Sequence, residues 1–385
     1  MSDGSTTLGV NAWRIRGQRT GVGRYLLNIL SHWTEQALAG RFRAVNVYAP
    51  APLDLADVAL PAPLRERTIG PAWRLLLWEN LRLGPSADDD VLFCPSFTRP
   101  LVSRGRTVVT THEATLHVHP ELYPRSARVF YDRLYGWSAR HATLVISDSE
   151  AAGRDVAGAY GVDSDRIRVI PLAPASIFRP RPDDPRVQEV RRRYAGGSPF
   201  FLFVGKLTGR RNLPLLVEAM AELRHRGGAE HRLVVIGLNT IELDVPALAA
   251  RLGAPDAVAH HEYVSDEDLG LLYNAATAFV MPAVYETVSL PVIEAQASGT
   301  PVITADVPGL REATGGEAIL TRPSDLSELV AALEQLATDD ALRQELAARG
   351  LEHAQRFSWE RSSAATLDVL AEAARLAPPP RRPSA

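Results

Sequence analysis

Cysteine is nearly absent from this chain of 385 residues, which contains only Cys94. A single cysteine can form neither an intramolecular disulfide nor a zinc site built on paired cysteines, so we expect a cytoplasmic protein. Long apolar runs are also missing: no stretch reaches the roughly 20 residues that span a bilayer, and Met1 to Gly9 lacks the basic-then-apolar order of a signal peptide. These absences predict a soluble globular chain.

An excess of charge of one sign is lacking too. The chain has 42 basic and 45 acidic residues and a formal net charge of -3, which excludes the strongly basic footprint of a dedicated nucleic-acid-binding protein. We therefore expect no nucleic-acid partner. Basic residues are in excess over residues 1–180 and acidic residues over the remainder. That asymmetry fits an anionic acceptor or a peripheral membrane contact, and fits chance more simply.

Short β-branched runs alternate with amphipathic stretches from end to end, a pattern typical of parallel sheets covered by helices on both faces. The length fits two such domains, 1–180 and 198–357, separated by the polar segment Phe178 to Pro199. A last amphipathic stretch covers 358–376, and the proline-rich tail 377–385 is predicted to be disordered. Ligands of open α/β sheets bind at the carboxyl ends of the strands, so the expected site lies in a cleft between the domains.

Ten strands are predicted from these runs. They are Leu8 to Trp13, Ala44 to Tyr48, Val91 to Cys94, Thr107 to Thr111, Thr143 to Ser147, Ile167 to Pro171, Phe200 to Gly205, Leu233 to Gly237, Ala278 to Pro282 and Pro301 to Thr304.

Two glutamates flank the start of a predicted helix over residues 290–298. Glu286 lies in the loop after a strand, and Glu294 lies in the first or second turn. Backbone N–H groups from Val288 to Leu290 occupy the positive end of this helix, where a phosphate binds well. One carboxylate would then hold sugar hydroxyls and the other ribose hydroxyls. The alternative is a pair of solvated acids near a helix N-terminus.

Lysine is reduced to one residue, Lys206, which follows Gly205 at the end of a predicted strand and precedes Arg210 and Arg211. Asn212 is a good cap for the helix predicted from Leu213. Cations held in a site of low dielectric stabilise the charge that develops when a nucleotide diphosphate departs. A solvated basic loop is the alternative.

Two further stretches carry residues suited to substrate contact. Gly21 and Gly23 stand where the first strand passes into a helix, a Gly-rich loop that lets substrate approach, although Leu26 occupies the third glycine's place in the dinucleotide signature. His112 follows a strand and could donate to a sugar hydroxyl, or serve only a structural role. The acidic run Asp88 to Asp90 lacks companion histidines and is expected to be a solvated turn, so we expect no metal site.

These stretches, in this order, resemble the retaining GT-B glycosyltransferases of family four, and the resemblance covers most of the chain. The stretches that carry it are Gly21 to Tyr25, His112-Glu113, Val145 to Ser149, Val204-Gly205-Lys206, Arg210 to Asn212, Val264 to Leu269 and the E-x7-E pair Glu286 and Glu294. The stretch from Trp359 looks like the family's terminal helix, which returns to the first domain.

The resemblance implies a GT-B fold: two doubly wound, Rossmann-like α/β domains facing each other across a cleft. It implies metal-independent transfer, with retained configuration and no cofactor, from a GDP or UDP sugar to a hydroxyl of a glycan, lipid-linked or small-molecule acceptor. By the family pattern Lys206 and Arg211 bind the diphosphate, Glu294 the ribose and Glu286 the transferred sugar, while His112 contacts the sugar. The other implied donor-binding residues are Gly21, Gly23, Gly205, Val264, Thr287, Val288, Ser289 and Leu290.

Departures from the family pattern lie in the donor loop. Thr287-Val288-Ser289 replaces the usual Gly-Phe-Gly or Gly-Phe-Ser, and β-branched Thr287 does not easily take a positive φ, so the loop is expected to be reshaped. Lys206 and Arg211 are exchanged relative to the usual order. The first domain, including Trp78 to Asn80 and Cys94 to Phe97, looks most like mannosyltransferases of polysaccharide assembly, so mannose is the first expectation for the sugar. A nucleotide-sugar 2-epimerase and a non-catalytic sugar-nucleotide-binding module are the alternatives.

Overall fold

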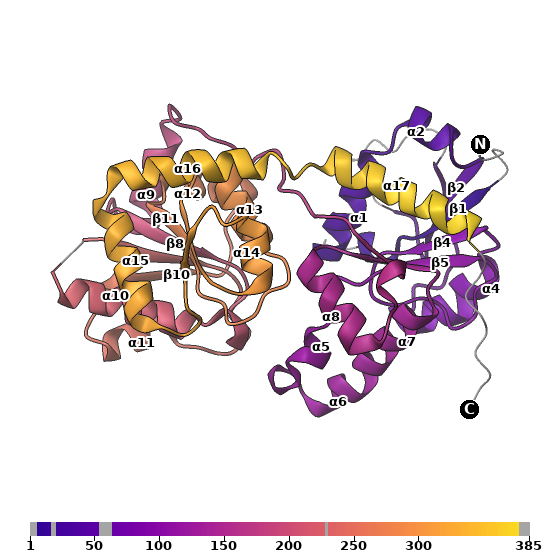
Figure 1. Cartoon of the computed structure of the whole chain (residues 1–385), viewed down its shortest axis with the longest axis horizontal. Coiled ribbons are helices and arrows are strands. Elements are labelled where there is room, and N and C mark those ends of the chain that lie inside the picture. Colours follow the sequence, from indigo (N-terminus) through magenta and orange to yellow (C-terminus); the bar gives the residue numbers. More distant parts are fainter. Residues whose placement is uncertain (1–5, 17–20, 54–63, 228–229, 377–385) are drawn as a thin grey trace. The chain divides into compact units, whose positions relative to one another are not determined.

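The computed structural model divides the chain into two units, shown in Figure 1. Unit 1 comprises Met1–Leu172 and Ser358–Ala385, and unit 2 comprises Ala173–Phe357. The structure describes residues 6–16, 21–53, 64–227 and 230–376. The tail 377–385, predicted to be disordered, lies outside the described residues.

Unit 1 is built on a parallel sheet that has seven strands within the described residues, in the order β3-β2-β1-β4-β5-β6-β7. The interior strands are apolar and buried along their length, as expected when helices cover both faces. The strands are β1 Thr7–Asn11, β2 Ala44–Ala49, β3 Leu64–Thr68, β4 Val91–Cys94, β5 Arg106–Thr110, β6 Leu144–Ser147 and β7 Ile167–Val169.

Helices cover both faces of this sheet, with α1 and α17 on one side and α7 and α8 on the other (Figure 1). Two helical runs change pitch midway, with π-helical turns at Glu79–Leu83 and Arg128–Asp132. The α-helices of unit 1 are α1 Gly21–Ser31, α2 Glu35–Ala39, α3 Leu75–Trp78, α4 Gly84–Ser86, α5 Thr115–Val118, α6 Arg125–Ala127, α7 Arg133–His141, α8 Glu150–Tyr160 and α17 Trp359–Arg375.

The last helix, α17, is far from unit 1 in sequence but packs against α1. Its buried serines are hydrogen bonded to unit 1: the Ser363 hydroxyl donates to the Ile29 carbonyl at 2.8 Å, and the Ser362 hydroxyl donates to the Pro171 carbonyl at 2.6 Å. Arg41 and Asp368 add an ion pair at 2.6 Å. The amphipathic stretch predicted for 358–376 is therefore an integral helix of unit 1.

Unit 2 repeats the design with a parallel sheet of six strands within the described residues, in the order β10-β9-β8-β11-β12-β13. The strands are β8 Phe200–Val204, β9 Arg232–Ile236, β10 Val258–His261, β11 Ala278–Met281, β12 Val302–Ala305 and β13 Ile319–Thr321. The helices are α9 Arg186–Ala195, α10 Leu213–His225, α11 Val245–Arg251, α12 Asp266–Ala275, α13 Leu290–Ala297, α14 Pro308–Thr314, α15 Leu326–Thr338 and α16 Asp340–Ala354. Buried phenylalanines of β8 and β11 form the centre of its core.

The predicted boundary segment differs from the observed one. Unit 1 ends at Leu172, and Phe178 to Pro199 belongs to unit 2. Phe178 and Val190 lie in the unit 2 core, and α9 packs on α12. The polar composition of this segment reflects a surface helix whose narrow apolar side docks on the core, not a free linker.

Three strands escaped the sequence prediction: β3, β10 and β13. All three are edge strands. The burial of β3 shows why, since Leu64 is half-buried and the four residues after it are exposed. An edge strand with a solvated face carries no apolar run, so its sequence resembles that of a loop.

Candidate functional site

The residues predicted to bind the donor lie mainly in the loops after β8 and β11, the neighbouring strands at which the strand order of unit 2 reverses. Such a switch point leaves a crevice at the carboxyl ends of the two strands. The backbone N–H of Val284 donates to the carbonyl of Arg210 at 2.8 Å, which joins the two loops. The fold thus brings the basic stretch and the first glutamate of the E-x7-E pair to one place.

Glu286 is the centre of this cluster and is 5% exposed. Its Oε1 lies 3.6 Å from the Arg210 guanidinium and 3.8 Å from that of Arg211. Lys206 is exposed in the same loop, and its carbonyl accepts from Arg211 Nη1 at 3.4 Å. The two arginines predicted to form a solvated or phosphate-binding loop thus hold a buried carboxylate in position.

Glycines make this close arrangement sterically feasible. Gly205 has φ of +138°, and a Cβ there would lie 1.7 Å from Arg211 Nη1. Gly309, in α14, faces the backbone of Glu286, where a Cβ would lie 2.0 Å from its carbonyl oxygen. Side chains at these positions would displace either the guanidinium or the glutamate loop.

Glu294 lies on α13, with its side chain near the ring of Tyr273 on α12. The Tyr273 hydroxyl donates to Glu294 Oε2 at 3.1 Å. Burial, reinforced by the Glu294 charge, raises the pKa of Tyr273 well above its ordinary value. Glu294 therefore has a fixed orientation through a phenol that stays protonated.

The loop before α13 is tightly packed. Thr287 and Ser289 are buried, Val288 and Leu290 are half-buried, and Thr287 keeps a negative φ. Ser289 occupies the N-cap position, yet its hydroxyl makes no capping bond and lies buried without a hydrogen-bond partner among the described residues. An acceptor oxygen of a ligand at this helix end would satisfy it.

Asn212 and Val264, two other residues singled out from the sequence, lie next to the starts of α10 and α12. Asn212 precedes α10 but makes no side-chain cap; it has φ of 51°, a left-handed conformation that asparagine tolerates better than most residues. Its expected capping role is therefore wrong. Val264 is buried in the turn that leads to α12, whose cap is Ser265, accepting from the Asp268 N–H at 3.0 Å.

In unit 1, His112 follows β5 and has both ring nitrogens engaged. Nδ1 lies 2.6 Å from Asp148 Oδ2, and Nε2 lies 3.1 Å from the Pro95 carbonyl oxygen. A carboxylate and a carbonyl only accept, so both nitrogens donate and the ring is an imidazolium. Burial lowers the pKa of His112, but the charge and hydrogen bond of Asp148 outweigh it, so the pKa is raised.

Asp148 was not singled out from the sequence, although it lies in the stretch Val145 to Ser149. A signal existed: Thr110 pairs with Ile146, and His112 and Asp148 each stand two residues beyond that pair. Residues at equal distances beyond paired positions of neighbouring parallel strands meet at the same edge of the sheet.

The predicted Gly-rich loop is not a loop where it is described. Gly21 and Gly23 form the first turn of α1, with Gly21 exposed and Gly23 buried. Arg19 and Thr20, quoted with them, lie outside the described residues. Glycine is tolerated both in a loop and in the first turn of a helix. The glycine pattern alone therefore could not distinguish a loop from a helix start.

A small pocket of about 180 Å³ lies near His112. It is lined by the rings of Phe97, Tyr123, Tyr135 and Tyr160 together with Glu113. Phe97 stacks on Tyr135 with ring centres 4.7 Å apart and meets the His112 ring edge-on at 5.2 Å. The backbone of Phe97 is left-handed, with φ of 60°, a costly conformation for an aromatic residue that marks functional sites.

A carboxyl group beside Asn11 and Thr98 is fully buried. Glu79 accepts from Asn11 Nδ2 at 2.8 Å and from the Thr98 hydroxyl at 2.8 Å. Burial raises the pKa of Glu79 to about 7, against the opposing effect of these two bonds and of Arg14. The network ties the end of β1 to the loop after β4.

The acidic run before β4 is solvated only in part, since Asp88 and Asp90 are exposed but Asp89 is buried. Asp89 is 3% exposed and accepts from Asn46 Nδ2 and the Tyr48 hydroxyl. Within residues 6–16, 21–53, 64–227 and 230–376, no group of three or more histidine, cysteine or acidic side chains is arranged to hold a metal ion. The same residues include no helix that is both long enough and apolar enough to cross a bilayer.

Comparison with known proteins extends these observations. Residues 19–173 match the family model Glycosyltransferase Family 4, and residues 188–353 match Glycosyl transferases group 1. O-antigen chain mannosyltransferase B of Escherichia coli is 28% identical over 69% of this chain and 70% of its own length. D-inositol 3-phosphate glycosyltransferase of Nocardia farcinica is 31% identical over 70% of this chain, which spans only 60% of that relative.

Solved structures agree on the fold. WaaG, a glycosyltransferase involved in lipopolysaccharide biosynthesis, has a TM-score of 0.66 and 20% identity, covering 94% of this chain and 99% of that one. Anabaena HepE, solved with UDP and glucose, has a TM-score of 0.72 and 18% identity, covering 95% and 99%. Two parallel-sheet, Rossmann-like units and the two adjoining family matches together show that the chain belongs to the family-four, group 1 glycosyltransferases of GT-B fold.

Proposed function

We propose that this chain is a cytoplasmic hexosyltransferase that moves a sugar, with retained configuration and without a metal ion, from a nucleotide diphosphate sugar to a hydroxyl acceptor. The observation that carries the proposal is the cluster of Arg210, Arg211 and buried Glu286 at the switch point of unit 2. Clustered guanidiniums balance the charge of a departing nucleotide diphosphate. Mannose is the first choice of sugar, in keeping with the mannosyltransferase among its relatives.

The donor site is assigned as follows. Lys206 and Arg211 bind the diphosphate, assisted by the N–H groups at the start of α13 and by the buried Ser289 hydroxyl. Glu294, oriented by Tyr273, binds the ribose, and Glu286 binds the transferred sugar. Gly205 gives these groups room to approach. No general base is assigned, because a departing phosphate can take the acceptor proton in a front-face reaction.

The acceptor is a saccharide that enters the aromatic pocket of unit 1. Aromatic faces present negative potential to the polarised C–H groups of a sugar ring, and Glu113 can accept from its hydroxyls. His112, held as an imidazolium by Asp148, supplies a positive charge beside this pocket. A carboxylate and aromatic rings together suit a neutral, hydroxyl-rich ligand.

A thermal-shift screen of the intact chain against GDP, UDP, ADP and their sugars, with and without EDTA, tests the donor site. A nucleotide at 100 times its Kd raises the free energy of unfolding by about 2.7 kcal/mol. We expect one nucleotide to raise the midpoint of unfolding, by the same amount with and without EDTA. Lys206→Ala should reduce this thermal shift, whereas Glu262→Gln, a change at an exposed residue, should not. Absence of any shift would contradict the donor assignment.

Product analysis separates the three functions. A transferase consumes the donor only when a saccharide acceptor is present, and Glu286→Gln removes most of that turnover. A 2-epimerase converts the donor without an acceptor. A binding module shows the thermal shift but no turnover with any acceptor.

A further inference from the structure

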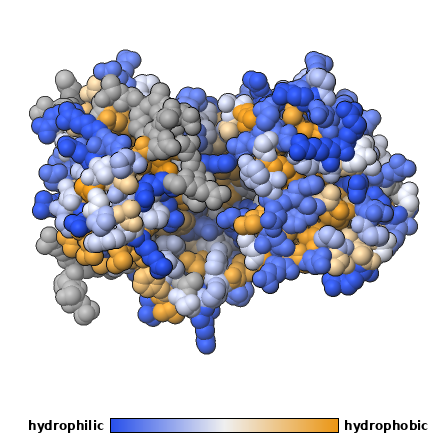
Figure 2. Space-filling model, turned by 180° about the vertical axis from the view of Figure 1, so that it is seen from behind, coloured by the Kyte–Doolittle hydropathy of each residue, from blue (hydrophilic) through white to orange (hydrophobic). Residues whose placement is uncertain are grey.

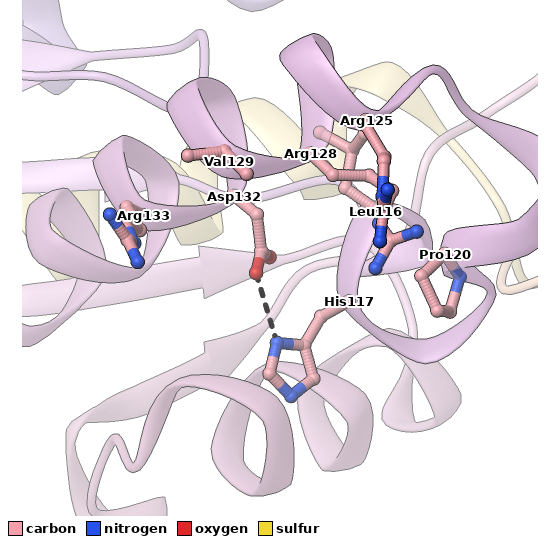
Figure 3. Close-up of a pocket in the computed structure, with 8 residues that line it drawn as sticks. All are labelled: Leu116, His117, Pro120, Arg125, Arg128, Val129, Asp132 and Arg133. Carbon is pink, nitrogen blue, oxygen red and sulfur yellow. Dashed lines mark hydrogen bonds and ion pairs between the residues drawn. The ribbon is translucent and has the colours of Figure 1, made fainter.

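A groove on unit 1, separate from the aromatic pocket, is lined by three arginines. It has a volume of about 470 Å³, and Arg125, Arg128 and Arg133 line it together with Asp132 and His117. In Figure 3 the pair Asp132 and His117 lies between Arg133 on one side and Arg125 and Arg128 on the other. We call it the arginine groove.

Its positive charge is offset only in part: Asp132 lines the groove, and the Arg128 charge helps to lower the pKa of Glu121. None of the three guanidinium groups forms an ion pair with a carboxylate in the part of the chain that the structure describes. The nearby carboxylates are engaged by histidines instead: Asp132 with His117 at 3.1 Å and Glu121 with His119 at 2.9 Å. An anion with more than one charge would complement the groove.

Exposed apolar side chains lie on the same segment of the chain as the arginines, and one of them, Val129, lines the groove. Val129 and Phe130 are each 56% exposed, Val118 is 38% and Leu122 is 37% exposed. Figure 2 shows hydrophobic surface next to hydrophilic side chains at the end of unit 1 that carries α5 and α6. A ligand suited to this surface has an anionic group and an adjoining apolar chain.

The local backbone supports a binding role. Arg128, Val129 and Asp132 belong to the π-helical turn Arg128–Asp132, which interrupts the run between α6 and α7. Such turns cost stability and recur at functional sites, because they redirect side chains that a regular helix would place elsewhere. Here the turn supplies both charge and apolar surface to the groove.

The arginine groove adjoins the aromatic pocket. Leu116 lines both cavities, and the His117 ring at the groove meets the Tyr160 ring at the pocket with centres 5.9 Å apart. A single extended molecule can therefore occupy the two. The pocket suits a saccharide, and the groove suits the group to which that saccharide is attached.

We infer that the arginine groove binds the phosphate of a lipid-linked acceptor, a saccharide carried on a phosphate or diphosphate ester of an apolar chain. The inference rests on the proposed transfer to a saccharide and names the acceptor class. A saccharide joined to a lipid through one phosphate is a phosphodiester with about one negative charge, and one joined through a diphosphate carries about two; the oxygens of either group form paired bonds with a planar guanidinium. The chain of the lipid would lie over Val129, which lines the groove.

Binding of octyl phosphate to the intact chain, measured by calorimetry without any donor, tests this. We expect octyl phosphate to bind at least tenfold more tightly than inorganic phosphate or octyl glucoside. Arg125→Gln, Arg128→Gln and Arg133→Gln should each weaken it about tenfold, and Val129→Ser should weaken octyl phosphate but not inorganic phosphate. Exposed Arg104, also in unit 1, gives the matched control Arg104→Gln, which should leave binding unchanged.

Three outcomes would overturn the inference. The first is that octyl phosphate does not bind, and the second is that it binds but the three arginine variants leave its affinity unchanged. The third is that the chain binds only phosphatidylglycerol vesicles and that the arginine variants abolish this binding, which would make the groove a membrane-docking surface. The nucleotide thermal shift is independent of this groove. Loss of octyl phosphate binding with an intact nucleotide response would therefore reject the groove alone, whereas loss of the nucleotide response rejects the donor site.

Discussion

His112 and Asp148 face each other at 2.6 Å because each stands two residues beyond the paired positions Thr110 and Ile146 of neighbouring parallel strands. Asp148 is almost fully buried, so its charge acts on the ring through a medium of low dielectric. The second nitrogen of the ring is held by the Pro95 carbonyl. Both ring nitrogens are therefore engaged by acceptor oxygens, an arrangement that favours the protonated ring.

Asp148→Asn is expected to lower the pKa of His112 toward or below its ordinary value. Because the pKa of His112 is raised in the folded state, protonation of its ring adds to the free energy of unfolding. This contribution is complete when the pH is below the unfolded-state pKa of about 6.5, and it is lost as the pH rises through the folded-state pKa. If the imidazolium assists transfer, the alkaline limb of the activity profile should move to lower pH in the variant. Exposed Asp163→Asn is the control, and identical profiles would argue against a charged His112.

Glu79→Gln is expected to flatten the dependence of stability on pH. The folded pKa of about 7 exceeds the ordinary value of 4.5, so the folded state binds the proton more strongly and wild-type stability falls as pH rises from about 4.5 to 7. The difference corresponds to about 3 kcal/mol. Urea unfolding at pH 5 and pH 8 measures it; an equally steep fall in the glutamine variant would point to another group.

Gly205→Ala should impair nucleotide binding through the Arg211 guanidinium. The added methyl group meets Nη1 and requires a left-handed backbone at this position, so we expect a loss of about 1–3 kcal/mol in stability and a smaller nucleotide shift. Gly158→Ala, in α8 with open space around the position, is the matched control and should stabilise by up to about 1 kcal/mol. If Gly205→Ala and Gly158→Ala had equal effects on stability and on the nucleotide shift, the proposed clash with the Arg211 guanidinium would be wrong.

Ser289→Ala should leave the stability of the free protein unchanged or slightly higher, since its buried hydroxyl has no partner among the described residues. Nucleotide affinity should fall about tenfold, because the hydroxyl would lose a bond to a charged phosphate. Ser298, also on the α13 segment, has a similarly buried hydroxyl without a described partner. Ser298→Ala therefore serves as control, and a comparable loss of nucleotide affinity there would refute the role of Ser289.

Much of the fold was legible in the sequence. All ten predicted strands occur. Nine of them are interior strands, and buried parallel strands require continuous β-branched or aromatic runs; the tenth, β7, is a half-buried edge strand. The three unpredicted strands lie at sheet edges, where a strand with a solvated face does not need a continuous apolar run. Prediction also misplaced the boundary, since α9 is polar on most of its surface and docks through few apolar residues.

The candidate site divides in the same way. Residue types and spacing along the chain, such as the interval from Glu286 to Glu294 or the lone Lys206, identified the family without any structure, and they predict its donor loops. Contacts between loops of different strands did not follow from spacing: the approach of Arg210 and Arg211 to Glu286, the pairing of His112 with Asp148 and the rings around Phe97. The sequence determines which side chains are present and how apolar and polar residues alternate along each helix and strand. Strand order and register alone decide which of them share a sheet edge, and so which charges meet in a dry environment.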